Sequence, residues 1–207
     1  MSSPIQRVAV IGSGVMGAGI AAHCANAGCE VLLLDIVKEG GDRSAIAKAA
    51  VQQMAKSNPE MLMHKGNVKL ISAGNIEDDL DKLSEADWVI EVIVENLGIK
   101  KSLYASMSEH IGPDTIVSSN TSTLPRAELV EGMSSEMTSR FFITHFFNPP
   151  RYLPLLEVVT SPEVDDSVTE RLCSFADEQL GKRVIMCNDT PGFIGNRLGV
   201  YFIQRAF

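Results

Sequence analysis

The pattern of apolar and polar positions predicts strands and helices in alternation along most of the chain. Residues 8–35 run through a short apolar stretch, a glycine-rich turn, a helical pattern and a second apolar stretch that ends on Asp35. Short apolar runs bounded by turn residues are typical of buried strands. The opening segment therefore predicts a strand, a helix and a second strand.

An insertion interrupts this pattern, because about 50 residues separate Asp35 from the next strongly apolar run. Helical spacing predicts a helix over residues 42–57, which the Asn58-Pro59 pair ends. The pattern then predicts a strand over residues 67–72, a turn at residues 73–75 and a short helix or turn over residues 78–83. We therefore expect a helical insertion at about residues 38–66.

Strand and helix patterns alternate again in the second half of the chain. Residues 88–94 form an apolar run broken only by Glu91, and predict a central strand covered by helices on both faces. Two later strands, at residues 140–145 and 155–160, are close in sequence, so we expect them to pair antiparallel. The remaining predicted elements are helices over residues 100–111 and 165–180 and strands over residues 115–119 and 182–187.

A last helical pattern begins at Asp189-Thr190-Pro191, where a side-chain oxygen able to cap a helix precedes a proline. The pattern carries apolar side chains to the end of the sequence without a glycine to end the helix. We therefore expect a first domain at residues 1–188. Residues 189–207 are expected to form the linker and first helix of a helical second domain that continues beyond the sequence.

Composition and charge limit the function classes. The formal net charge is −8 and the sequence pI is about 5.0, which argue against nucleic acid as the main partner. No apolar run reaches the length of a membrane span, and the first residues show no signal sequence. The four cysteines form no CxxC pair, so we expect buried thiols and no metal site, in the reducing environment of the cytoplasm.

The glycine-rich turn after the first predicted strand matches the G-x-G-x-x-G pattern of dinucleotide-binding sites. Gly12 permits the tight turn, Gly14 lets the backbone approach a pyrophosphate, and Gly17 lets the helix pack on the strand. Val15 and Met16 lie in the first helical turn, where free N–H groups and the helix dipole favour an anion. The sequence predicts a Rossmann-type α/β fold, with a doubly wound and mostly parallel sheet.

Asp35 ends the second predicted strand, where a carboxylate can accept hydrogen bonds from both hydroxyls of an adenosine ribose. The same carboxylate would repel a 2′-phosphate, and no arginine lies next to it. We therefore expect NAD and not NADP as the cofactor. The alternative is a glycine-rich turn that binds no ligand, which the strand before it, the helix after it and the acid at the right distance make less favourable.

Three further motifs follow in order, Ser118-Ser119-Asn120-Thr121-Ser122, then HFFNP at residues 145–149 and DTPGFIGNR at residues 189–197. With these motifs the chain resembles the L-3-hydroxyacyl-CoA dehydrogenases over nearly its whole length. The resemblance implies oxidation of L-3-hydroxyacyl-CoA to 3-ketoacyl-CoA with hydride transfer to NAD, in fatty-acid β-oxidation. It also implies a helical domain that dimerises and closes the acyl-CoA site. We therefore expect a homodimer, and slow turnover by these 207 residues alone.

The oxidation of a secondary alcohol needs a base, since hydride leaves readily only as the O–H proton departs. His145 suits this role because imidazole titrates near neutral pH, and Glu157 can fix its tautomer and stabilise the imidazolium. By resemblance, His145 is the general base and Glu157 its partner. Ser122 and Asn196 match the family positions that bond the substrate oxygen and orient this pair.

The resemblance also implies that Glu95, Lys100 and Asn120 contact NAD near its nicotinamide half. In the family a helical arm between the second and fourth strands contacts CoA. The basic residues of the corresponding segment, which are only candidates for this role, are Arg43, Lys48 and Lys56. His23, His64 and His110 are expected to be structural or surface residues.

Two other functions stay open at this point. One is a related NAD-dependent dehydrogenase that acts on a hydroxy acid, which HFFNP and Glu157 disfavour. The other is a non-catalytic, crystallin-like protein that binds NAD. The presence of His145, Glu157, Ser122 and Asn196 together argues against that second alternative.

Overall fold

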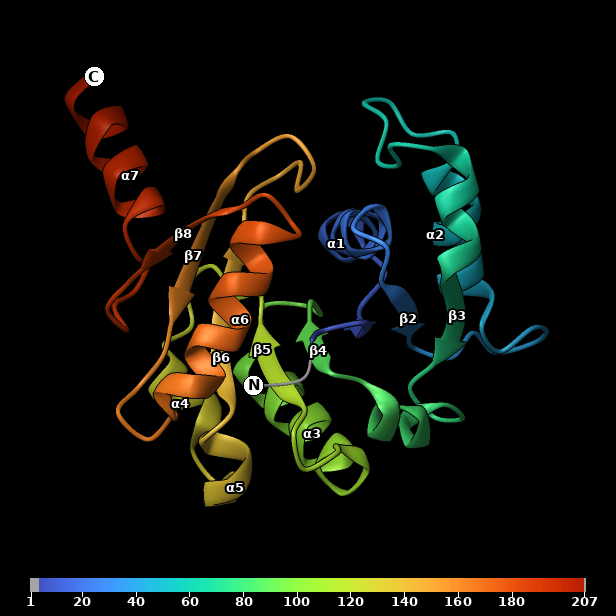
Figure 1. Cartoon of the computed structure of the whole chain (residues 1–207), viewed down its shortest axis with the longest axis horizontal. Helices are drawn as coiled ribbons and strands as arrows, with labels where there is room; N and C mark the ends of the chain where they lie inside the picture. The colour runs from blue at the N-terminus through green and yellow to red at the C-terminus, as the bar shows by residue number, and fades with distance from the viewer. Residues whose placement is uncertain (1–3, 207) are drawn as a thin grey trace.

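The computed structural model describes residues 4–206, so the ends of the two predicted domains, residues 1–3 and 207, lie outside the described residues. An eight-stranded sheet crosses the molecule in the order β3-β2-β1-β4-β5-β6-β7-β8 (Figure 1). The strands are β1 (Arg7–Ile11), β2 (Glu30–Asp35), β3 (Ile71–Asn75), β4 (Trp88–Glu91), β5 (Ile116–Ser119), β6 (Phe141–Phe146), β7 (Leu155–Val159) and β8 (Arg183–Met186). The α-helices are α1 (Val15–Asn26), α2 (Ala45–Met54), α3 (Leu97–Met107), α4 (Arg126–Val130), α5 (Ser135–Thr138), α6 (Asp166–Glu178) and α7 (Gly195–Ala206).

All neighbouring strands are parallel except β6 and β7, which pair antiparallel as predicted. The chain moves outward from β1 to β3, then returns to add β4 on the other side of β1. Ligands of such sheets bind at this switch point, beyond the carboxyl ends of the strands. The predicted doubly wound α/β fold is confirmed, and the glycine-rich turn lies at the switch point.

Alternating side chains of the strands divide the apolar core between the two faces of the sheet. On β1, Val8 and Val10 belong to the core under α1, α2 and α6, whereas Ala9 and Ile11 belong to the core under α3, α4 and α5. Trp88 packs between Phe146 and Phe175 on the first face. Both faces of β1 are therefore dry, as its continuous apolar sequence predicts.

The end of the insertion differs from the prediction. Residues 65–70 form a 3₁₀ helix, and β3 begins only at Ile71, so most of the predicted strand over residues 67–72 is wrong. The predicted turn at residues 73–75 is also wrong, because these residues are strand paired with the end of β2. Gly74 is needed there for close packing, since a Cβ would overlap the Asp79 carboxylate. The prediction failed because residues 73–75 have the composition of a turn.

The central strand is shorter than predicted. β4 ends at Glu91, because the Glu91 carboxylate accepts the Ile93 N–H and turns the chain out of the sheet. The next helix, α3, begins at Leu97, earlier than the predicted residue 100. Asn96 caps this helix by accepting the Ile99 N–H. The polar residues after the strand thus form a helix start.

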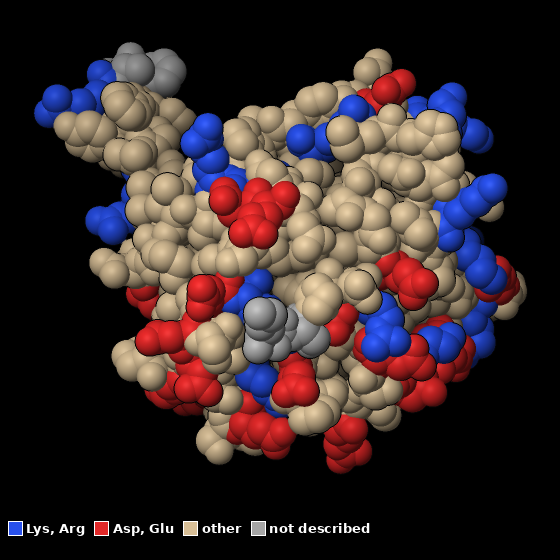
Figure 2. All heavy atoms as spheres, in the orientation of Figure 1, with Lys and Arg blue, Asp and Glu red and all other residues tan. Residues whose placement is uncertain are grey.

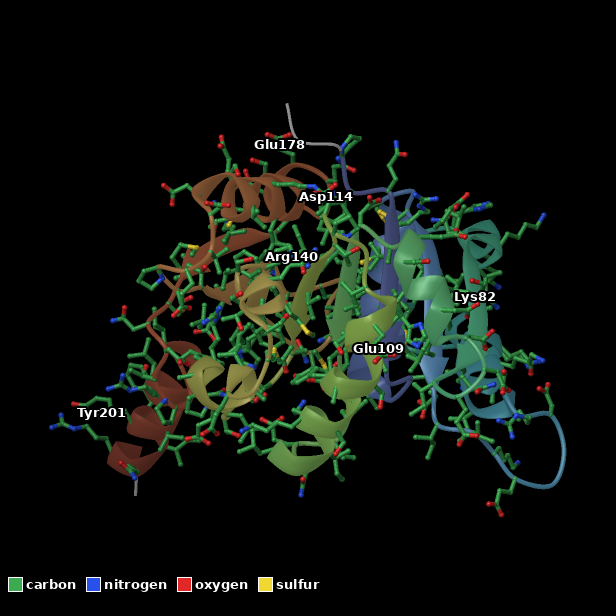
Figure 3. The ribbon with its side chains drawn as sticks, turned by 90° about the horizontal axis from the view of Figure 1, so that it is seen from below. Lys82, Glu109, Asp114, Arg140, Glu178 and Tyr201 are labelled. Atoms are coloured by element: carbon green, nitrogen blue, oxygen red, sulfur yellow. The ribbon has the colours of Figure 1, made fainter. Side chains whose placement is uncertain are left out.

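The last helix begins at Gly195, so the helix start predicted at residues 189–191 is wrong. Asp189 accepts the N–H groups of Arg126 and Ala127 instead, and so caps α4. Figure 2 shows α7 as a protrusion from the body, and Figure 3 places Tyr201 on α7 and Lys82 at opposite ends of the molecule. The exposed apolar side chains of α7 are Leu198, Val200, Tyr201, Phe202 and Ile203. Within residues 4–206, no helix combines the length and apolar character needed to span a membrane.

Candidate active site

The glycine-rich turn between β1 and α1 is packed too tightly for side chains at two of its three glycines. Gly12 has a φ of 105°, and a Cβ there would lie 2.6 Å from the Val92 carbonyl oxygen. A Cβ at Gly17 would overlap the Gly12 carbonyl. Nothing lies within 4 Å of a Cβ at Gly14. The turn is therefore closed on its inner side and open at Gly14, where a ligand could approach the backbone.

The N-terminus of α1 faces this open space. Gly14 is the N-cap residue and provides no side-chain cap, so the first N–H groups of the helix are not bound by a capping side chain. Val15 is 67% exposed and Met16 is half-buried. This arrangement fits an anion such as a pyrophosphate.

Asp35 lies at the end of β2, beside the glycine-rich turn. Its Oδ2 accepts hydrogen bonds from Ser13 N at 2.6 Å and Ser13 Oγ at 2.5 Å, and its Oδ1 accepts the Ile36 N–H at 2.7 Å. Ser13 occupies a variable position of the glycine pattern, so it could not be selected from the sequence. The Ser13 hydroxyl binds the carboxylate that a ribose would need, so a ribose would compete with this hydroxyl.

His145 and Glu157 lie directly opposite each other on the antiparallel strands β6 and β7. His145 Nδ1 lies 2.7 Å from Glu157 Oε2, and both side chains are buried. Glu157 Oε1 accepts the N–H groups of Ile194 at 3.0 Å and Gly195 at 2.7 Å. One buried carboxylate therefore orients the imidazole and also binds the start of α7.

Ser122 and Asn196 approach the other side of His145. The Ser122 hydroxyl lies 3.2 Å from His145 Nε2, and Asn196 Nδ2 donates to the Ser122 carbonyl at 3.5 Å. The structure thus brings together all four side chains that were predicted to be catalytic, from β6, β7, α7 and the loop after β5. The group has a histidine nitrogen, a hydroxyl and an amide on one side, as proton transfer at an oxygen would need.

Two aromatic rings that sequence reasoning did not select enclose His145. The ring centroids of Phe147 and Phe193 lie 4.6 Å and 5.6 Å from that of the imidazole. Phe193 is buried and has a φ of 45°, an uncommon conformation for a bulky residue. Phe147 belongs to the HFFNP motif and Phe193 to the DTPGFIGNR motif, but the sequence did not indicate that their rings pack against His145.

Glu95 organises the loop that carries Ser122. Its Oε1 accepts hydrogen bonds from Ser122 N at 3.1 Å and from the hydroxyls of Thr121 and Thr123 at 2.5 and 2.9 Å. Partial burial raises the Glu95 pKa, but these hydrogen bonds and the charge of Lys100 outweigh burial, and the pKa is lowered. The Glu95 side chain remains 39% exposed, so it can bind the loop and still meet a ligand.

Lys100 is only 1% exposed, and its main partner is Glu91. The Lys100 ammonium lies 2.5 Å from Glu91 Oε1 and 3.5 Å from Glu95 Oε2. Tyr104 and Ser119 each donate a hydrogen bond of 2.6 Å to Glu91 Oε2, and burial followed by the Glu91 charge raises the Tyr104 pKa. Glu91 interrupts the apolar run over residues 88–94, and this was the only feature of the sequence that pointed to a buried polar cluster here.

Asn120 connects the end of β5 to the strand that carries His145. Its Oδ1 accepts the Phe146 N–H at 2.9 Å, and its own N–H donates to the Glu91 carbonyl. Asn120 therefore lies between the switch point of the sheet and the His145 group, where its amide nitrogen could meet a ligand.

The insertion forms a hollow of about 520 Å³ between the end of α2 and the segment that follows it. Its lining includes Lys56, His64 and Lys65. Arg43 is paired with Glu77 and Asp78, and Lys48 is paired with Asp42. Of the three basic candidates, Lys56 alone therefore lines the hollow.

Comparison with known proteins identifies the same fold and family across the chain. Residues 7–190 match the family model described as "3-hydroxyacyl-CoA dehydrogenase, NAD binding domain". A probable 3-hydroxyacyl-CoA dehydrogenase of Deinococcus radiodurans is 48% identical over 98% of this chain, and a putative fatty acid oxidation complex trifunctional enzyme of Rickettsia felis is 47% identical over 99%. This chain spans 59% and 28% of the lengths of those two proteins. The crystal structure of 3-hydroxybutyryl-CoA dehydrogenase from Escherichia coli matches 99% of this chain and 42% of its own, at 32% identity and a TM-score of 0.84.

Proposed function

The chain belongs to the 3-hydroxyacyl-CoA dehydrogenase family, and we propose that the whole protein oxidises L-3-hydroxyacyl-CoA to 3-ketoacyl-CoA with NAD, in fatty-acid β-oxidation. The observation that carries this proposal is the position of His145 between Glu157 and Ser122, at the carboxyl edge of a sheet that has a dinucleotide-binding turn.

The cofactor is NAD, as the family of this domain requires. We propose that Gly12, Gly14 and Gly17 with the N–H groups of Val15 and Met16 hold the pyrophosphate, because the turn is open only at that end. Asp35 would bind the adenosine ribose after the Ser13 hydroxyl turns away from it. When bound, NAD supplies the acceptor for the hydride that leaves the substrate carbon.

His145 then takes the substrate O–H proton on Nε2, the nitrogen that faces Ser122. Loss of this proton lets the oxygen form a carbonyl as the C–H bond gives up its hydride. Glu157 holds Nδ1 and stabilises the imidazolium that results. The Ser122 hydroxyl and the Asn196 amide can hold the substrate oxygen without adding a competing charge.

In this proposal the nicotinamide half of the cofactor is supported by Glu95, Lys100 and Asn120. Glu95 and Asn120 can contact the cofactor directly, whereas buried Lys100 acts through Glu95 and Glu91. Lys56 and the hollow beside it are the proposed CoA contacts in the insertion.

Assembly and location are also parts of the proposal for the whole protein. We propose a homodimer formed through a helical domain that begins near residue 189, after an NAD-binding domain at residues 1–188. The exposed apolar side chains of α7 support an interface there. The four free cysteines support a reducing compartment, the cytoplasm.

Calorimetric titration of NAD and NADP into the 207-residue chain, and kinetics of the whole protein with acetoacetyl-CoA and NADH, test the proposal. We expect saturable binding of NAD and much weaker binding of NADP. We also expect His145→Ala to lower kcat by about 10²–10⁴ without loss of NAD affinity. Unchanged activity of His145→Ala would contradict the mechanism, and equal rates with CoA-free hydroxy acids would contradict the substrate class.

A further inference from the structure

The connection between β6 and β7, residues 147–154, contacts the insertion through two side chains. Arg151 Nη1 donates to the carbonyl oxygens of Glu60 at 2.7 Å and Leu62 at 3.1 Å. The Tyr152 hydroxyl donates to the same Glu60 carbonyl at 3.0 Å. A connection that begins two residues after His145 is therefore bound to a segment almost 90 positions earlier in the chain.

The segment that Arg151 binds is also held from its other edge. Asn26, at the end of α1, donates from Nδ2 to the Met61 carbonyl at 2.9 Å and accepts the Met63 N–H at 2.8 Å. Residues 60–63 are thus held through three successive peptide groups, between α1 on one side and the β6–β7 connection on the other. Figure 1 shows the loop after α2 and the β6–β7 connection at the same end of the molecule, on either side of α1.

This held segment is a wall of the hollow in the insertion. Glu60, Leu62 and Met63 line the hollow together with the end of α2 and the cationic side chains of Lys56 and Lys65. Leu62 is buried in the core, whereas Glu60 and Met63 are exposed, so the hydrogen bonds to the peptide groups add to the packing of Leu62 in setting the position of the wall. A change at Arg151 should therefore move the hollow.

The β6–β7 connection is itself held in place by Lys182 and by α1. Lys182 is buried and donates from Nζ to the carbonyl oxygens of Pro150 and Leu153, the second at 2.9 Å. The Pro150 ring lies against Gly19 of α1, where a Cβ would be 2.9 Å from Pro150 Cδ. The connection is thus held by Lys182, the residue before β8, and by α1. Arg151 in turn binds the insertion to this fixed connection.

Arg151 has no carboxylate within ion-pair distance among the described residues. Its guanidinium instead donates to two carbonyl oxygens, and it lies over the Tyr152 ring at 5.2 Å. A cation that binds peptide carbonyls sets the geometry of the backbone, and hydrogen bonds from a charged donor are stronger than those between neutral groups.

We propose that Arg151 is a positioning residue for the acyl-CoA substrate. It fixes the hollow of the insertion relative to the strand that carries His145, so that an acyl-CoA whose CoA part is held in the hollow brings its 3-hydroxyl to the histidine. This inference rests on the proposed function. Tyr152 assists by binding the same carbonyl, and its removal should have the smaller effect because Arg151 still holds that oxygen.

Steady-state kinetics of the whole protein with acetoacetyl-CoA and NADH test the proposal. Arg151→Ala should raise the KM for acetoacetyl-CoA about tenfold, the loss expected for one charge-assisted contact. We expect kcat to stay within about threefold and the KM for NADH to stay unchanged, because the glycine-rich turn and His145 are not contacted by Arg151. Arg151→Lys should restore much of the loss, since a lysine can still donate to one carbonyl.

Arg7→Ala is the matched control, because Arg7 is an exposed arginine at the amino end of β1 with one long ion pair to Glu85. An unchanged KM for acetoacetyl-CoA in Arg151→Ala would overturn the proposal. Equal losses of kcat, NADH affinity and thermal stability would overturn it as well, since they indicate a general structural role. A wild-type protein that does not act on acetoacetyl-CoA would instead overturn the proposed function, and this inference with it.

Discussion

The glycine-rich turn and the His145 group are two halves of one candidate site, and they are built in opposite ways. The turn consists of six consecutive residues, 12–17, and its geometry depends on the absence of side chains at Gly12 and Gly17. The His145 group joins side chains from four parts of the chain, including a contact across 74 positions. The turn offers backbone N–H groups to a ligand, whereas the His145 group offers side-chain chemistry.

This difference decides which substitutions each half can tolerate. A methyl group is too large at Gly12 and Gly17, because the Cβ would overlap backbone atoms there. At the His145 group, replacing a charged side chain by a neutral one of the same size should do more harm than changing its size, since both oxygens of Glu157 are hydrogen-bonded. Side-chain volume should therefore limit substitutions in the glycine-rich turn, and charge should limit them in the His145 group.

Gly17→Ala should have the largest effect. Its Cβ would overlap the Gly12 carbonyl, so we expect the free energy of unfolding to fall by more than about 4 kcal/mol, a loss that few single substitutions cause. Thermal and urea unfolding of the chain measure it. Gly14→Ala is the control, because its Cβ meets nothing; it should fold normally and bind NAD about tenfold more weakly. Equal stabilities of the two variants would show that volume does not limit the turn.

Glu157→Gln should affect catalysis more than folding. The glutamine oxygen can still accept the N–H groups of Ile194 and Gly195, but its NH₂ group cannot accept a hydrogen bond from His145 Nδ1. We expect kcat of the whole protein to fall by about 10²–10⁴, and the free energy of unfolding to fall by about 1–3 kcal/mol. Stopped-flow NADH oxidation and thermal unfolding give the two values. A variant that keeps the wild-type kcat would remove Glu157 from the mechanism.

His23 links α1, the helix that follows the glycine-rich turn, to the segment before β8, and its substitution should give the smallest effect. It lies in the last turn of α1, and its Nε2 bonds the Leu180 carbonyl just before β8. Burial, with the nearby charge of Lys182, lowers the His23 pKa from 6.5 to about 4. The unfolded chain therefore binds the proton first, so the contribution of His23 to stability is constant above about pH 6.5 and is lost as the pH falls towards 4, by at most about 3 kcal/mol.

His23→Gln tests this, because glutamine can also donate to the Leu180 carbonyl but does not titrate. Urea unfolding between pH 7.5 and pH 4.5 should show a smaller loss of stability in the variant than in the wild type. Identical pH dependence in the two proteins would mean that His23 does not bind its proton on unfolding in this range.

Much of the fold could be predicted from the sequence where the signals are local. The order of β1, α1 and β2 follows from the apolar runs and the glycines between them, and the antiparallel pairing of β6 with β7 follows from their short connection. The predictions failed where a partner far along the chain decides the outcome. Gly74 and Asn75 have the composition of a turn, but pairing with β2 extends them into a strand.

The side chains of the candidate site divide in the same way. Sequence alone predicted the glycine-rich turn, and the steric limit at Gly17 is local because it arises against Gly12, whereas the limit at Gly12 comes from Val92, far along the chain. The sequence also indicated that a histidine and a glutamate lie on two neighbouring strands, whereas the strand register of the folded chain places them directly opposite each other. Only the tertiary structure decided that Glu157 binds the start of α7, that Asp189 caps α4, and that Lys100 is buried against Glu91. The physical reason is that hydrogen bonds and ion pairs of carboxylates depend on which donors the folded chain brings within about 3 Å, and local sequence does not set that distance.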